Sequence, residues 1–207
     1  MRVLGALVEK DITTPDYYPL SLNALVNACN QKNNRDPVMN LNEDAVRAAL
    51  ESLQSQRLAG PAQGADSRVT KYEHRMQEVF NFDRREIAIL CVLLLRGAQT
   101  SGELRGRTER MYRFEELDDV VTTLDRLSQR EPALVAVLPR QPGTKESRYM
   151  HLLSGSAPPA AAAVAREMSK SSLSDDRVSS LEAEVAELRK EIAEMQQQLA
   201  AFRKAFE

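Results

Sequence analysis

Hydrophobic residues recur at helical spacing in three segments of the first 55 residues. The three apolar faces consist of Val3, Leu4, Leu7 and Val8, then Leu22, Leu25, Val26 and Cys29, then Val46, Ala49, Leu50 and Leu53. Ser21 and Asn42 stand before the second and third segments, and both residue types cap helix N-termini well. The pattern therefore predicts three amphipathic helices.

A two-stranded hairpin is expected after the third helix. Its first strand starts near Leu58, residues 61–67 form a tip rich in turn residues, and the second strand runs from Arg68 to His74. Polar loops are expected at 11–19 and 30–40. Three helices followed by a hairpin is the element order of a winged helix, which is a helix-turn-helix extended by a β-hairpin wing.

The same pattern occurs twice in the chain. The two histidines mark it, because Lys71-Tyr72-Glu73-His74 and Arg148-Tyr149-Met150-His151 share the order basic residue, Tyr, any residue, His. Two apolar blocks also match in the same order, residues 3–7 with 89–93 and 46–53 with 120–127. Three matched blocks indicate two copies of one small domain.

The second copy shows the same signals for helices and a wing. Its helices are expected at 86–96, from Thr100 onward and at 114–130, and its wing strands at 134–139 and 148–153. Thr100 and Glu103 have the spacing of a capping box. We therefore expect two tandem winged-helix domains, at 1–76 (first repeat) and 77–153 (second repeat). The fold class is α+β, mainly α with small β-hairpin wings.

A linker is expected at 154–176, and a heptad pattern occupies 177–207. The a positions are Val178, Val185, Ile192, Leu199 and Phe206, and the d positions are Leu181, Leu188, Met195 and Phe202. This pattern predicts a C-terminal coiled-coil helix that forms a parallel homodimer. The core of that dimer would be Leu181, Val185, Leu188, Ile192, Met195, Leu199 and Phe202. The alternative is a single amphipathic helix that folds back on the winged domains.

Charge gives no sign of a strongly basic protein. Residues 1–153 hold 21 Lys/Arg and 21 Asp/Glu, and the rest of the chain holds 7 and 9, which gives the net charge of −2. Any DNA binding must therefore rest on a local basic patch. The longest apolar run, Ile87–Leu95, is far shorter than the ~20 residues of a membrane span, and no signal peptide is recognisable. A cytoplasmic protein without membrane contact is expected.

Catalytic and metal-binding patterns are missing from the sequence. Each repeat has one histidine and one cysteine, too few for a metal site, and the two cysteines do not occupy matching positions. Cys29 and Cys91 both lie on apolar stretches. There is no Gly-rich phosphate loop, nucleophile elbow or HExxH motif. We expect no enzyme and no cofactor. Tyr72 and His74, like their counterparts in the second repeat, are expected to close the base of the wing against the third helix.

Two basic loops are the candidates for nucleic-acid contact. Both lie between the second and third helices of their repeat, at 30–36 and 105–113. The candidate DNA-contacting residues are Lys32, Asn33, Asn34, Arg35, Arg105, Arg107 and Arg110 in these loops, with Arg47 on the third helix and Lys71 and Arg148 on the wings. Arginine suits bidentate phosphate contacts. The alternatives are a solvated turn for the first loop and an interface between the repeats, or ion pairs with nearby acids, for the second.

Acidic residues at the start of both third helices argue against ordinary major-groove reading. Glu43 and Asp44 precede the first of these helices, and Glu115, Glu116, Asp118 and Asp119 precede or begin the second. They would repel phosphate at the position where a DNA reader approaches the groove. Two hypotheses remain. The first, which we favour, is a dimeric DNA-binding or regulatory protein that binds double-stranded DNA. The second is a winged-helix module that binds a protein partner.

Two long motifs resemble the YceH-like family of uncharacterised bacterial proteins. The first spans residues 13–38 and includes Thr13-Thr-Pro-Asp-Tyr-Tyr-Pro-Leu-Ser21. The second spans 99–114 and includes Gln99-Thr-Ser-Gly-Glu-Leu-Arg105. The resemblance covers nearly all of residues 2–153 and implies tandem winged-helix domains. It carries over no catalytic residues, and the transcription-factor-type fold that it implies is an analogy at the level of the fold.

Overall fold

The first repeat places three helices around a small sheet. The computed structural model describes residues 1–62, 69–140 and 146–155. The elements of the first repeat are α1 (Arg2–Thr13), η1 (Pro15–Tyr17), β1 (Leu20–Ser21), α2 (Leu22–Cys29), α3 (Glu43–Ser55), β2 (Ala59–Pro61) and β3 (Lys71–His74). The Ser21 side chain accepts a hydrogen bond from the amide of Ala24, and the Asn42 side chain accepts one from the amide of Ala45. Both predicted helix caps are confirmed.

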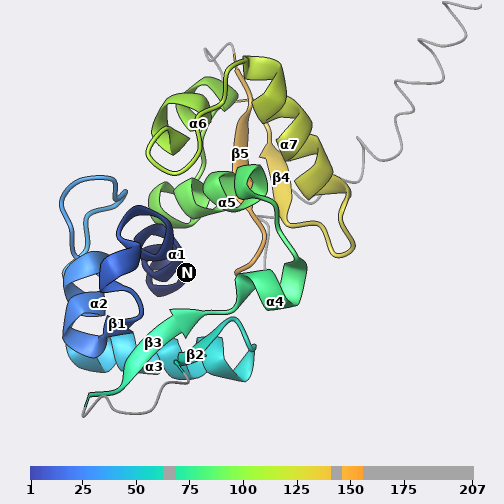
Figure 1. Ribbon diagram of the computed structural model, residues 1–207. Coiled ribbons are helices and arrows are strands. Elements are labelled where there is room, and N and C mark those ends of the chain that lie inside the picture. Colours follow the sequence, from blue (N-terminus) through green and yellow to red (C-terminus); the bar gives the residue numbers. More distant parts are fainter. Residues whose placement is uncertain (63–68, 141–145, 156–207) are drawn as a thin grey trace, which may run out of the picture. The chain divides into compact units, whose positions relative to one another are not determined.

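The second repeat follows the same order (Figure 1). Its elements are α5 (Arg84–Arg96), α6 (Ser101–Thr108), α7 (Leu117–Gln129), β4 (Val135–Leu138) and β5 (Arg148–His151). The Thr100–Glu103 capping box is confirmed. A short helix that the pattern did not predict, α4 (Met76–Phe80), connects the two repeats. The third helix begins at Leu117 instead of Phe114, and α1 extends through Thr13 into the expected loop.

Strand pairing also repeats. The first sheet has the order β1-β3-β2, with all pairs antiparallel, and Leu20 lies opposite Tyr72. In the second repeat β4 pairs with β5, and an isolated bridge joins Gln99 to Tyr149. The two tyrosines are the matched residues of the sequence repeat, and each pairs with the residues just before the second helix. The predicted α+β class, helices with small antiparallel sheets, is confirmed.

The core joins the two repeats through α1 and α5. These two helices contact each other directly, and Figure 1 shows them side by side. Every residue from Ile87 to Leu95 is buried, because α5 also contacts α6, α7 and β5. At Gly5 of α1, an added Cβ would lie 2.9 Å from Cβ of Leu94. The α1 pattern predicted one buried face, but other faces are covered as well, and Arg2 and Glu9 are buried. Arg2 donates to the carbonyl oxygens of Cys29 and Pro37 in the first repeat, and Glu9 contacts Arg110 of the second.

The histidines occupy different surroundings in the two repeats. His74 Nε2 lies 3.1 Å from Asp11 of α1, and its backbone amide donates to the Tyr18 hydroxyl at 2.7 Å. His74 was expected to pack against the third helix, α3. That expectation is wrong about the helix, because His74 contacts α1. His151 is partly buried, and its Nδ1 has no hydrogen-bond partner among the residues that the structure describes. Burial lowers the pKa of His151 to about 4.

The predicted linker and heptad lie beyond the described residues. Position 155 is the last one described, so the heptad core from Leu181 to Phe202 stays a prediction. Within residues 1–62, 69–140 and 146–155, no helix combines the length and the apolar character that a membrane span requires.

Candidate nucleic-acid interface

A single buried carboxylate joins the two basic loops. Glu9 on α1 is 1% exposed. Its Oε2 lies 2.6 Å from Nη2 of Arg35 in the first loop, and its Oε1 lies 2.7 Å from Nη2 of Arg110, which follows α6. The sequence predicts both loops between the second and third helices of their repeats. In the structure Arg105 and Arg107 lie on α6 (Ser101–Thr108), so their assignment to a loop is wrong, and of these three candidates only Arg110 follows the helix. The structure brings the first loop and Arg110 together at Glu9.

Glu9 neutralises only part of the positive charge of Arg35 and Arg110. Burial opposes ionisation of this carboxyl, but hydrogen bonds and positive charge from Arg35 and Arg110 outweigh burial and hold its pKa below the usual range. An ionised Glu9 supplies one negative charge to two guanidinium groups. Arg110 is half-exposed, with a side-chain accessibility of 50%, so its free edge is open to a second anion.

Arg35 does not belong to the exposed surface. Its side chain has no accessible area. Its guanidinium also donates to the carbonyl of Ala28 at 2.7 Å and to Oε1 of Gln31 at 3.2 Å. The prediction that Arg35 contacts DNA is therefore wrong. A buried carboxylate on α1, far away in sequence, draws this side chain inward, and its role is to hold the first loop in place.

The first loop docks on the C-terminal end of α5. Arg96 Nη2 donates to Oδ1 of Asn34 at 2.6 Å, and the amide of Asp36 donates to the carbonyl of Leu95 at 3.0 Å. Asn34 has a positive φ of 60°, a conformation that asparagine tolerates well. Burial lowers the pKa of Arg96, and the positive charges of Arg107 and Arg110 lower it further. Arg96 therefore lies in a crowded positive environment.

A second carboxylate gathers two more candidates. Glu103 of α6 lies 3.2 Å from Nη2 of Arg107 and 3.5 Å from Nη2 of Arg148 on β5. Arg148 also donates to the carbonyl of Ala98 at 2.7 Å. We call the surface formed by these cations the junction face. It consists of Lys32, Arg96, Arg107, Arg110 and Arg148.

The charge of the junction face is positive but small. Including buried Arg35, six cations gather there, against five acids at positions 9, 36, 103, 109 and 146, which gives a net charge of +1 (6 − 5). Lys32 and Asn33 are exposed in the first loop. A surface of this kind can attract a polyanion, and its affinity should depend strongly on salt.

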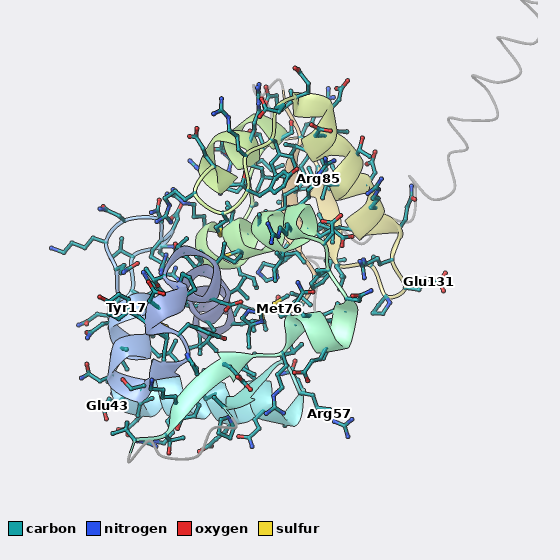
Figure 2. All side chains as sticks on the ribbon, in the orientation of Figure 1. Tyr17, Glu43, Arg57, Met76, Arg85 and Glu131 are labelled. Carbon is teal, nitrogen blue, oxygen red and sulfur yellow. The ribbon has the colours of Figure 1, made fainter. Side chains whose placement is uncertain are left out.

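The remaining candidates lie away from this face or are already bonded. Arg47 is exposed on α3, and Lys71 is exposed on β3. Arg105 donates to the carbonyl oxygens of Phe114 and Glu115, so it closes the loop that follows α6. Figure 2 shows Glu43 at the exposed start of α3. The repulsion of phosphate at this position stays a prediction.

Sequence reasoning missed the two residues that organise the face. Glu9 belongs to a largely apolar helix. The arginines that bond to it, Arg35 and Arg110, are 26 and 101 residues away in sequence. No local pattern reports such distant pairing. Arg96 ends α5, and a basic residue is common at the C-terminal end of a helix because it stabilises the helix dipole. The one available indication in the sequence was an acidic residue, Glu9, in a largely apolar helix.

Thiol chemistry finds no support at this site. Cys29 and Cys91 are buried and unbonded to each other. Burial raises the pKa of Cys29 to about 11 and raises that of Cys91 as well. Thiolates, which are the nucleophilic form, are therefore scarce at neutral pH. No group of three or more potential metal ligands occurs within the part of the chain that the structure describes.

Comparison with known proteins identifies the family. The family model described as "Protein of unknown function, DUF480" matches residues 1–144. The chain belongs to this family. A UPF0502 protein of Koribacter versatilis is 60% identical over 184 residues, which cover 89% of this chain and 86% of the relative. A UPF0502 protein of Citrifermentans bemidjiense is 55% identical over 207 residues, covering 100% and 96%. The family resemblance drawn from residues 13–38 and 99–114 is confirmed.

Proposed function

We propose that this DUF480 family member is a non-enzymatic, double-stranded DNA-binding protein of the transcription-regulator type, built from two tandem winged-helix domains. The observation that carries the proposal is the junction face, where basic residues of both repeats meet at Glu9. The repeated order of helices and strands, with matched Tyr72 and Tyr149 pairings, supports the winged-helix assignment.

The contacts to DNA come from the junction face and not from α3 and α7. The first turns of both helices carry two acids each, at 43 and 44 and at 118 and 119. Placing these helices in the major groove would set carboxylates against phosphates. Arg107 and Arg110, by contrast, are held by carboxylates on one side and open to solvent on the other. Phosphate contacts from this face position the protein without reading sequence.

Dimerisation through the heptad of residues 177–207 is part of the same proposal. A homodimer would present two junction faces to one duplex, so binding would be bivalent. The supporting observation is the unbroken alternation of apolar residues at a and d from Val178 to Phe206.

The test measures binding of a fluorescent random duplex to the full chain at about 50 and 200 mM salt, the range in which phosphate-contacting proteins weaken strongly. The junction variant Lys32→Gln/Arg107→Gln is compared with a matched variant on the third helices, Arg47→Gln/Arg126→Gln. Each removes two cations. Binding that falls with salt and is weakened by the junction variant alone is expected. Absence of binding at the lower salt concentration would overturn DNA recognition.

A second candidate function has its own supporting observation. The exposed acids at the starts of α3 and α7 suit a basic protein partner better than a nucleic acid. In that case the tandem domains act as a protein-interaction module and have no role on DNA. Two results together would favour this alternative. The unaltered chain would not bind DNA at the lower salt concentration, and the variant Glu43→Gln/Asp44→Asn would no longer bind a purified basic partner that the unaltered chain binds.

A further inference from the structure

Tyr17 is an exposed aromatic ring on a firmly held turn. It has the largest exposure, 79%, among the large hydrophobic residues that the structure describes. Its amide donates to the carbonyl of Thr14 at 3.1 Å, and the amide of Tyr18 donates to that of Pro15 at 3.0 Å. The Tyr18 hydroxyl in turn accepts a hydrogen bond from His74. The backbone at Tyr17 is therefore fixed while its ring faces solvent.

A groove of about 340 Å³ lies beside this ring, between α1, η1 and α2. Its apolar floor is formed by Leu20, Ala24 and Ala28. Lys10 lies at the α1 side, and Asn27 and Gln31 lie at the α2 side. The groove thus combines an aromatic wall, a narrow apolar floor, two carboxamides and one ammonium group.

The two carboxamides of the groove offer one hydrogen-bond acceptor and one donor. Asn27 donates its amide to Asn23, which leaves its carbonyl oxygen as an acceptor. Gln31 uses its carbonyl oxygen to accept from Arg35, which leaves its amide as a donor. A nucleobase edge presents donors and acceptors side by side and can bond to such a pair. Aromatic rings stack on bases of any type.

The groove adjoins the first basic loop at Gln31. Gln31 lines the groove and bonds to Arg35, and Lys32 of the junction face follows it in the chain. On the other wall, Lys10 follows Glu9, the residue that joins the two loops. Figure 2 shows Tyr17 beside the helices of the first repeat, below the loop that follows α2 in Figure 1. A nucleic acid bound at Lys32 would therefore lie near the Gln31 end of the groove.

We propose that this groove binds an unstacked nucleobase of the DNA that lies on the junction face, with Tyr17 as the stacking platform and Lys10 on a flanking phosphate. The proposal rests on the proposed function. In a regular duplex both faces of each base are covered by its neighbours, so the groove is filled only where a base is unpaired. The protein therefore prefers duplexes with a single-stranded or distorted segment. Since the junction face carries a net charge of only +1, stacking supplies affinity that charge alone does not.

The test compares an intact duplex with one of the same length that carries a short single-stranded gap. By fluorescence anisotropy the full chain should bind the gapped duplex about tenfold more tightly, the size of one base–aromatic stack. Tyr17→Ala should remove this preference and leave binding of the intact duplex unchanged, and Tyr17→Phe should keep the preference. Val38→Ala, which alters another exposed hydrophobic residue (58% exposed), is the matched control.

A second readout reports stacking directly. With 2-aminopurine placed in the gap, binding of the unaltered chain and of Tyr17→Phe should change its fluorescence, and binding of Tyr17→Ala should not. Equal affinity of the unaltered chain for both duplexes would overturn the nucleobase site alone. A preference for the gapped duplex that persists in Tyr17→Ala would also overturn the nucleobase site. In that case the exposed ring of Tyr17 would be better explained by contact with a protein partner. Failure to bind either duplex would overturn the proposed function together with the site.

Discussion

Glu9 in the first repeat accepts a hydrogen bond from Arg110 in the second repeat at 2.7 Å, across 101 residues of chain. The same carboxylate bonds to Arg35, and neither Glu9 nor Arg35 has appreciable contact with solvent. A buried charge without its partner is strongly unfavourable, so each of these two residues depends on the other. The ionic centre therefore fixes both basic loops relative to α1.

The substitution Glu9→Gln should destabilise the folded chain by about 3 kcal/mol, because it leaves the buried guanidinium of Arg35 without a counter-charge. Urea denaturation followed by circular dichroism would measure this as a lower midpoint with an unchanged slope. Arg110→Ala is the control. Arg110 is half-exposed, and loss of its ion pair should cost only about 1 kcal/mol or less. Equal effects of the two substitutions would contradict a buried Glu9–Arg35 pair.

Replacing both buried partners provides a further check. Glu9→Leu combined with Arg35→Met removes both charges at once and substitutes apolar side chains of similar length. Such replacements of buried ion pairs are often neutral or stabilising. The double variant should therefore be more stable than Glu9→Gln alone. If it were less stable, the hydrogen bonds of Arg35 to Ala28 and Gln31 would matter more than its charge pairing.

The cysteines should be inert in the folded protein. Burial raises the pKa of Cys29 to about 11, and Cys91 is buried in the α1–α5 contact, where its Sγ lies 3.5 Å from the carbonyl oxygen of Gly5. At pH 8 we expect almost no reaction of either thiol with a water-soluble disulfide reagent in the native state, and release of two equivalents after denaturation. Rapid reaction of one thiol without denaturant would show that the α1–α5 core opens easily.

Local patterns predicted local structure well. Ser21, Asn42 and Thr100 were identified as helix caps from residue type and spacing alone, and each makes the expected hydrogen bond. A cap acts over three residues, so its signal is complete within a short window. The wing strand at Arg148 was also placed correctly, because the basic-Tyr-x-His pattern repeats.

The junction face could not be predicted, because it is made by long-range contacts. Arg35 lies in a polar loop and has the sequence environment of an exposed residue. Its burial depends on Glu9, which belongs to another helix. Tyr17 lay inside a family motif, but its exposure follows from the turn geometry of η1, which the sequence did not indicate. Candidate residues were thus found by type, and their grouping required the fold.

Stability should depend on pH through His151. Burial lowers the pKa of this side chain to about 4, against an ordinary value of 6.5 in the unfolded chain. Between these values the unfolded state binds more protons, so the contribution of His151 is fully present above pH 6.5 and is lost as the pH falls toward 4. The loss amounts to at most about 3 kcal/mol, from the size of the shift.

The variant His151→Leu isolates this effect from the titration of carboxyl groups. Its stability should fall less than that of the unaltered chain between pH 6.5 and pH 4.5, when both are measured by urea denaturation. Similar stability of the two chains at pH 7 would show that the substitution fits the site. Parallel pH profiles would contradict the lowered pKa and would mean that His151 gains a proton without cost in the folded state.

Two glycines in helices should respond to alanine in opposite directions. At Gly5 an added Cβ would lie 2.9 Å from Cβ of Leu94 and 3.0 Å from the Leu95 side chain. The Leu94 atom is attached directly to the backbone of α5, so it cannot rotate away and the two helices must separate. At Gly106 of α6, an added Cβ would meet nothing within 4 Å. Both substitutions gain the same helix propensity, about 1 kcal/mol.

Gly5→Ala should therefore destabilise the chain by about 1–2 kcal/mol, because overpacking at the α1–α5 contact exceeds the gain in propensity. Gly106→Ala should stabilise it by up to about 1 kcal/mol, since only the propensity term applies. Thermal unfolding of the two variants beside the unaltered chain measures the difference, with shifts in Tm of opposite sign. A rise in Tm for Gly5→Ala would mean that α1 and α5 are held less closely than 2.9 Å implies, and the core that unites the two repeats would need another explanation.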